Sequence, residues 1–366
     1  MPYSSSHSTA PRHPLRLLIA LVALLGLGAC AQETPVATVR FTAFSAQVDL
    51  SLVGVTQRQA KQAAALIQED FAFMEQAWHA WHPGPMGRVN RLLVAGEPFI
   101  APPSTMPLVR LSKAFEDQSG GLFNPAIGYL MDLWGFHADA VRGRPPPPGQ
   151  QITRLVEAAP SMAQIEIDGL ELRGKNPAIK LDFDAITKGY ALDLAIEHLR
   201  ELGVKSALIQ AGSEVRVIGD RSGQPWRVTI RRPSGAGVLG IVEMRGDESL
   251  VTRGAYDRNF VFKGTTYHAI LDPRTGSPAK DTRAVTVIHR DATTAAAAAT
   301  ALFVAGPNDW HAVATRMGVR YVILVDAEGT LHMNPAMAAR LELVDTLAPT
   351  RLAEELTEPA TATDTP

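Results

Sequence analysis

The chain has 366 residues, and its 35 Lys and Arg against 37 Asp and Glu give a formal net charge of -2. This balance excludes a generic nucleic-acid binder, which needs a basic face for phosphates. Apolar residues make up 46% and charged residues 20%, so the chain can bury a core and is not intrinsically disordered. The single cysteine excludes a disulfide framework and a zinc site built from several cysteines.

The N-terminus has the pattern of a secretory signal. Arg12 and Arg16 precede an apolar run over residues 17–29, which is too short to span a hydrocarbon core of about 30 Å as a helix. The last residues, Leu27-Gly28-Ala29-Cys30, resemble a bacterial lipobox. The pattern predicts a lipoprotein signal peptide over 1–29, lipidation of Cys30 and a tether over 30–40, with attachment to a membrane through the lipid. The alternative is an ordinary signal peptide with an incidental cysteine.

The next elements follow from apolar spacing and from Gly and Pro. A capping box of Thr56 and Gln59 opens a run of apolar residues at helical spacing, which predicts a helix as far as Trp78. Residues 82–107 are rich in Pro and Gly and are predicted to be loop, interrupted at 89–93. A second helix is expected over 107–118, ending at Gly120-Gly121.

The second half predicts strands that do not alternate regularly with helices, which favours an α+β fold over a doubly wound sheet. Helices are expected over 187–202 and, rich in alanine, over 291–304. A hairpin is expected between 321–326 and 330–333. The other predicted strands are 179–183, 206–210, 214–218, 226–231, 240–244, 249–252, 259–263 and 283–289. One domain is expected over 41–345, followed by a disordered tail over 346–366.

Four segments carry candidate chemistry. The first, residues 120–125 (GGLFNP), ends a helix and exposes backbone amides, although it could simply be a turn into an aromatic cluster. The second, residues 181–190 (LDFDAITKGY), carries an acidic strand end into a helix start, where free N–H groups favour an anion. Lys188 can add a positive charge for a phosphate. The simpler interpretation of this second segment is capping by Asp184 and Thr187.

The other two segments are turns. Residues 211–214 (AGSE) link two strands and allow close approach of the backbone. In residues 268–278 (HAILDPRTGSP), Asp272 can accept from later amides, Pro273 fixes φ, and Gly276 allows a positive φ.

These segments, in this order, resemble the FAD:protein FMN transferases, also called the ApbE family, over roughly residues 41–340. The resemblance implies an α+β flavin transferase fold with a T-fold-like core. It implies binding of FAD with Mg²⁺ and transfer of FMN onto a Thr hydroxyl of a target protein, with release of AMP. The acceptor would be a redox protein, for example a subunit of a membrane redox pump. Many members are tethered in the periplasm, so the resemblance places the chain in the bacterial cell envelope.

The resemblance also assigns site residues. Trp81 would stack on the flavin, and Phe44 lies where a Met usually contacts the isoalloxazine. The residues that would contact FAD are Phe44, Trp81, Leu122, Phe123, Asn124, Asp182, Lys188 and Ile270. The metal would take the backbone carbonyl of Ala185 and the hydroxyl of Thr300.

Several positions depart from the family pattern. Ala296 stands where the metal carboxylate is expected, on the helix face of Thr300, and Asn124 replaces an Asp. The usual Thr-Ser-Gly-Asp-Tyr reads TRGAY over 252–256, the usual His reads Ala269 with His268 beside it, and 83–87 replace a Ser-rich loop. Asp184 or Asp272 would have to compensate for the missing carboxylate, since Asp291 lies more than one helical turn away. The alternatives to a transferase are an FAD-binding periplasmic lipoprotein without transfer activity and a structural lipoprotein without a ligand.

Overall fold

A computed structural model of the chain describes residues 35–137, 143–233, 236–344 and 348–356. The predicted signal peptide and Cys30 lie outside these residues. Within them, no helix is both long enough and apolar enough to cross a membrane. The first strand already begins at Val36, so residues 36–40 belong to the folded domain and not to a tether.

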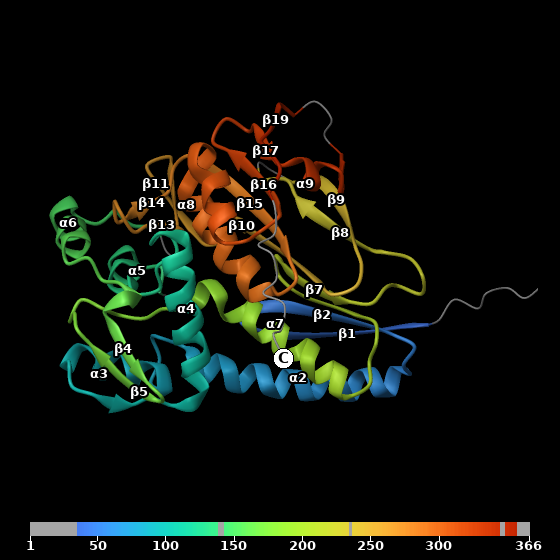
Figure 1. Ribbon diagram of the computed structural model, residues 1–366, viewed down its shortest axis with the longest axis horizontal. Coiled ribbons are helices and arrows are strands. Elements are labelled where there is room, and N and C mark those ends of the chain that lie inside the picture. Colours follow the sequence, from blue (N-terminus) through green and yellow to red (C-terminus); the bar gives the residue numbers. More distant parts are fainter. Residues whose placement is uncertain (1–34, 138–142, 234–235, 345–347, 357–366) are drawn as a thin grey trace, which may run out of the picture. The chain divides into compact units, whose positions relative to one another are not determined.

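A nine-stranded sheet forms the centre of the fold, in the order β1-β2-β6-β7-β10-β15-β16-β17-β19 (Figure 1). All neighbouring strands are antiparallel except β17 and β19. The strand bounds are β1 Val36–Ala43, β2 Ala46–Val53, β6 Ala207–Ala211, β7 Glu214–Ile218, β10 Glu248–Gly254, β15 Thr282–His289, β16 Tyr321–Asp326, β17 Leu331–Met333 and β19 Thr350–Leu352.

Three long helices cover one face of this sheet: α2 (Gln57–Trp78), α7 (Asp184–Glu201) and α8 (Ala292–Arg316) (Figure 1). Successive side chains of a strand point to opposite faces. On β10, Val251 therefore packs in the core under α7 and α8, whereas Leu250 packs in a second core on the other face. This alternation also directs Arg253 toward the helices.

The second core is covered by a three-stranded sheet of β8 (Trp226–Arg231), β9 (Val238–Met244) and β18 (Leu341–Leu343), together with α9 (Pro335–Ala338). A third, smaller cluster centres on Trp134, Phe136 and Phe260.

The remaining elements are α3 Pro85–Ala95, β3 Phe99–Ile100, the short η2 Pro103–Thr105, α4 Met106–Ser119, α5 Gly128–Trp134, α6 Gly149–Glu157, η3 Met162–Gln164, β4 Ile165–Asp168, β5 Glu171–Gly174, β11 Asn259–Phe262, β12 Thr265–His268, β13 Leu271–Asp272 and β14 Ser277–Pro278.

The helices and sheets confirm the α+β class. The Thr56–Gln59 capping box is present at the start of α2, and α4 ends at a left-handed Gly120 as predicted. The hairpin of β16 and β17 is also confirmed. The Ala-rich helix breaks at Gly306, close to its predicted end, and a second helical stretch continues to Arg316.

Three further sequence predictions are wrong. Residues 85–95 form helix α3 and not a loop, because Pro85 fits the first turn of a helix and Gly96 ends it in a left-handed conformation. Residues 179–183 are not a strand: Lys180 makes only an isolated bridge to Ile127. The tail is not wholly disordered, because Thr350–Leu352 pair with β17.

Candidate functional site

Two of the four candidate segments lie side by side. The backbone N–H of Asp182 donates to Pro125 at 2.9 Å, and Lys180 donates to Ala126 at 3.1 Å. Gly128 returns a bond to the Lys180 carbonyl at 2.8 Å. A Cβ at Gly128 would lie 2.5 Å from that same carbonyl oxygen, so only glycine allows the approach. The turn after α4 and the segment before α7 therefore form one unit.

A buried side chain that the sequence analysis missed fixes this unit in place. Asn90 of α3 donates from Nδ2 to the Leu181 carbonyl at 2.9 Å and accepts from the Leu181 N–H at 2.7 Å. It is only 7% exposed. Because residues 82–107 were predicted as loop, Asn90 had no place in the predicted site. The apolar spacing of Met86, Val89 and Leu93 could have indicated this helix.

Asp182 is the carboxylate that binds the start of α7. Its Oδ1 accepts from the Asp184 N–H at 3.1 Å, whereas the Asp184 side chain pairs with Arg258 at 3.2 Å. The Thr187 hydroxyl donates to the Phe183 carbonyl, so capping by Asp184 and Thr187 is wrong. Burial, with the nearby Asp184 carboxylate, raises the pKa of Asp182 to about 6. A carboxyl shifted in this way is typical of functional sites.

A buried charged cluster lies beside the first turn of α7. Glu214, at the start of β7, has a fully buried side chain, and its Oε1 accepts from Arg253 Nη1 at 2.9 Å. Arg253 Nη2 donates to the backbone carbonyl of Ala185 at 2.6 Å. The ammonium of Lys188 lies 3.7 Å from the same Glu214 oxygen. Two cations thus converge on one carboxylate where the segments 181–190, 211–214 and 252–256 meet.

Trp81, the residue predicted to stack on the flavin, already contacts a cation. Lys180 Nζ lies 3.7 Å from the ring centroid of Trp81, and the Lys180 side chain also pairs with Asp132 at 3.7 Å. The imidazole of His137 lies 5.1 Å from the Trp81 ring, tilted by 43°. A planar ligand on the face that Lys180 covers must therefore displace this ammonium.

Phe44 lies in the tight turn between β1 and β2. Both Phe44 and Ser45 have positive φ values, 49° and 54°, in a two-residue turn of the kind that favours Asn and Gly. The ring of Phe44 lies 5.3 Å from that of Phe71, and its N–H donates to Glu75 at 3.2 Å. Such strain at a bulky residue is found most often at functional sites.

The turn after α4 is built mostly from residues that support the fold. Leu122 and Phe123 are buried at 8% and 2% exposure. The Asn124 side chain donates to Pro160 at 2.8 Å and accepts from Ala126 at 2.9 Å, so it holds the turn together. The aromatic cluster considered for this segment is also present, with Trp134 near Phe136.

The turn over 268–278 has the predicted geometry. Asp272 accepts from the backbone N–H of Arg274 through its side chain and from Gly276 through its carbonyl, and Gly276 has a φ of 66°. Arg274 also pairs with the Asp272 carboxylate. Ile270 is half-buried against the main core, and its carbonyl accepts from Ala279.

His268 does not replace the histidine missing at position 269. It packs edge-on against Phe303 of α8, and burial lowers its pKa, which favours the neutral ring. Ala269 packs on the other side, against the cluster of Trp134 and Phe136. The two side chains thus pack in different clusters, so the imidazole does not occupy the surroundings of position 269.

The expected metal site lacks the carboxylate that a divalent cation prefers. The Ala296 side chain is a fully buried methyl group, and the Thr300 hydroxyl donates to the Ala296 carbonyl at 2.9 Å. A hard cation needs anionic or carbonyl oxygens. Asp184 and Asp272, the proposed substitutes, are held by Arg258 and Arg274. Among the described residues no cluster of three His, Cys, Asp or Glu could hold a metal.

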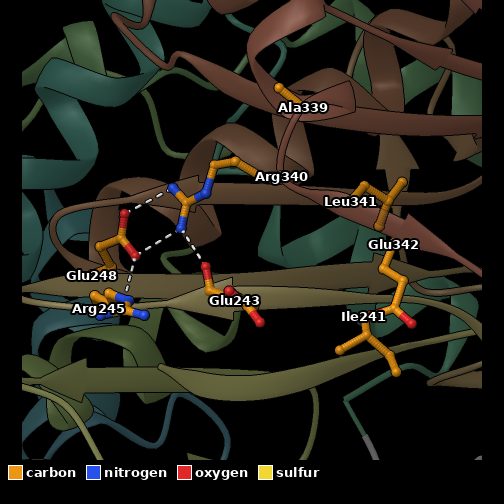
Figure 2. Close-up of a pocket in the computed structure, with 8 residues that line it drawn as sticks. All are labelled: Ile241, Glu243, Arg245, Glu248, Ala339, Arg340, Leu341 and Glu342. Carbon is orange, nitrogen blue, oxygen red and sulfur yellow. Dashed lines mark hydrogen bonds and ion pairs between the residues drawn. The ribbon is translucent and has the colours of Figure 1, made fainter. Parts of the chain in front are cut away.

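Two hollows lie away from the charged cluster of Glu214, Arg253 and Lys188. One, of about 990 Å³, lies beside α4 and is lined by Glu116, Gly121, Asn124 and Arg274 among others. The other, of about 530 Å³, lies on the three-stranded sheet, where Arg340 pairs with Glu248 (Figure 2). The Arg340 guanidinium in this second hollow is already bound by Glu248 and by the Glu243 carbonyl.

Comparison with known proteins identifies the family. Residues 41–323 match the profile of the ApbE family, so the chain belongs to this family. A FAD:protein FMN transferase of Rhodobacter capsulatus is 37% identical over 338 residues, which cover 91% of this chain and 64% of that protein. One of Vibrio cholerae is 30% identical over 239 residues, covering 64% of this chain and 70% of that protein. The chain thus spans less than two thirds of the length of the Rhodobacter relative.

Solved structures confirm the predicted flavin transferase fold. The ApbE protein of Thermotoga maritima is 27% identical with a TM-score of 0.76, covering 84% of this chain and 99% of that chain. The apo form of the flavinyl transferase ApbE of Pseudomonas stutzeri is 27% identical with a TM-score of 0.73, covering 84% and 97%.

Proposed function

We propose that this chain transfers FMN from FAD onto a Thr hydroxyl of an acceptor protein. The observation that carries the proposal is the match to FAD:protein FMN transferases across 91% of the chain. It is supported by the packing of the predicted FAD-contacting segments around the start of α7, where backbone bonds join residues 125–128 to residues 180–182.

The chemistry is a substitution at phosphorus. The acceptor hydroxyl oxygen attacks the phosphorus of the FMN half of the diphosphate, and the bond to the bridging oxygen breaks. AMP leaves with that oxygen, and the hydroxyl proton is released. Charge develops on the phosphate oxygens during this step. Lys188, Arg253 and the N–H groups at the start of α7 supply positive charge on this side of the fold.

A second candidate function is FAD binding without transfer. It is favoured by the alanines at positions 269 and 296. Both functions require FAD, so they differ only in the covalent product. For the transferase, the acceptor would be a redox protein, such as a subunit of a membrane redox pump.

Covalent flavin on an acceptor distinguishes the two functions. The protein is incubated with FAD and a flavin-accepting domain that carries the target Thr, and flavin fluorescence is read after denaturing electrophoresis. Transfer predicts a fluorescent acceptor band that is lost when the acceptor Thr is replaced by Ala. A protein that binds FAD but never labels the acceptor would contradict transfer and support the second candidate.

We also propose that Cys30 is lipidated and holds the chain at the periplasmic side of a membrane. The support is the position of this cysteine after Leu27-Gly28-Ala29 and a short apolar run. Cys30→Ser should release the protein from the membrane fraction. A Cys30→Ser protein that stays in that fraction would mean that something else anchors it.

A further inference from the structure

Arg253 occupies the space between the oxygens that a cation would use. Its Nη2 lies 2.6 Å from the Ala185 carbonyl oxygen, and its Nη1 lies 2.9 Å from Glu214 Oε1. These are a backbone carbonyl and a carboxylate, the oxygen types that hard divalent cations prefer. A Mg²⁺ that took the Ala185 carbonyl oxygen as a ligand would compete with the Arg253 N–H that already donates to it.

The charge that Arg253 brings is permanent. A guanidinium stays protonated at any physiological pH, so this position is cationic whether or not a metal is present. The Arg253 side chain is 12% exposed and that of Glu214 is fully buried, which fixes the pair in one geometry. Of the five N–H groups of the guanidinium, those that Glu214 and Ala185 do not use remain free to donate to a ligand.

The second oxygen of the buried carboxylate is not paired within the described part of the chain. Glu214 Oε2 is buried and has no hydrogen-bond partner among the residues that the structure describes. Lys188 lies 3.7 Å from Oε1 and is 25% exposed, so this second cation is partly accessible to a ligand. Arg253 and Lys188 face two carboxylates, Glu214 and the nearby Asp257. The guanidinium and the ammonium are the groups of the cluster that can donate to the diphosphate of a dinucleotide.

We propose that the guanidinium of Arg253 takes the place of the divalent cation in this chain, so that the diphosphate of FAD is bound without metal. This inference rests on the proposed function. It explains together why Ala296 carries no carboxylate and why an arginine follows Thr252. The cation is built into β10 and is not recruited from solution.

The test compares FAD affinity in EDTA with affinity in millimolar MgCl₂, by calorimetry on the wild-type protein. We expect dissociation constants that agree within about twofold, since the cation is already present. Tightening by about tenfold or more with Mg²⁺ would overturn the inference and leave the proposed function standing. A protein that binds no FAD in either buffer would contradict the proposed function itself. This comparison needs no variant and so does not depend on a mutant folding.

Variants at position 253 test whether metal-free FAD binding depends on Arg253. Arg253→Ala should weaken FAD binding in EDTA by about tenfold or more, whereas Arg227→Ala should not. Arg227 is the control, because it is also an ion-paired arginine of a strand but lies on the three-stranded sheet. The double variant Arg253→Ser/Ala296→Asp should bind FAD more tightly in Mg²⁺ than in EDTA. Equal affinity of Arg253→Ala and wild type in EDTA would contradict the inference.

Discussion

Glu214 is the residue that holds the charged cluster together. Its buried carboxylate faces Arg253 and Lys188 with no exposure to water. Removing one partner of a buried charge cluster leaves uncompensated charge, which costs far more than losing an exposed pair. The stability of the site therefore depends on this side chain more than on any flavin-facing group.

We expect Glu214→Gln to lower the free energy of unfolding by about 2 kcal/mol, because two cations lose their counterion in a partly buried setting. Urea unfolding of the single variants and the Glu214→Gln/Arg253→Gln double variant checks this. The cycle should show a coupling of at least about 1 kcal/mol, since the two side chains are in contact. Glu243→Gln, at an exposed pair, should change stability by less than about 0.5 kcal/mol. Additive single effects at positions 214 and 253 would mean that the pair carries no stability.

At the scale of elements, the two ends of the first helical stretch of α8 are specified locally. Asp291 caps its start by accepting from the Thr294 N–H at 2.7 Å, and Gly306 breaks it with a φ of 73° and a ψ of -177°. Asp193 of α7 adds bonds to the N–H groups of Ala292 and Thr293 at 2.9 Å each. These contacts fix the position of the helix that carries Ala296 and Thr300.

Acid should weaken the Asp291 cap. Burial alone would raise the pKa of Asp291, but its hydrogen bonds with His289 and Thr294 lower it to about 2. Because the folded pKa lies below the ordinary value of 3.8, the stabilisation is present above about pH 4 and is lost as pH falls toward 2. Asp291→Asn keeps an acceptor for the Thr294 N–H but does not titrate. Its unfolding free energy should fall less over that pH range than the wild-type value, and equal slopes would contradict the assignment.

The break at Gly306 should tolerate only glycine. Its φ and ψ lie in a region that side chains make unfavourable by about 1–3 kcal/mol, so Gly306→Ala should lower stability by that amount. Gly149→Ala is the control, because a Cβ at Gly149, at the start of α6, would meet nothing within 4 Å. Thermal unfolding compares the two. A Gly306→Ala protein as stable as the Gly149→Ala protein would show that the backbone relaxes at no cost.

At the scale of the whole molecule, local patterns predicted more than long-range ones. The capping box of α2 and the apolar–polar alternation of residues 226–231 are signals that can be read from neighbouring residues in the sequence. Both predicted elements are present, and burial alternates along β8 as expected. Residues 85–95 were missed because Pro and Gly at a helix start look like a loop when no packing partner is known. The type of element follows from neighbours in sequence, whereas the packing partner does not.

The same distinction applies to the site. Asp182, Lys188 and the Asp272 turn could be predicted, because each lies in a short segment with its own motif. The contact of Arg253 with Glu214 and Ala185 could not, because it depends on the register that pairs Val251 of β10 with Glu214 of β7. The sequence marked position 253 only as a departure from the family pattern. The contact of Arg253 with Glu214 forms only when the sheet brings β10 and β7 together.

The central claim is that this charged cluster binds the diphosphate of FAD. Its most direct test is calorimetric titration of the protein with FAD and, separately, with FMN. We expect FAD to bind with one site per chain and more tightly than FMN, because FMN carries a single phosphate and no adenosine. Equal affinity for FMN and FAD, or no binding of either, would contradict it.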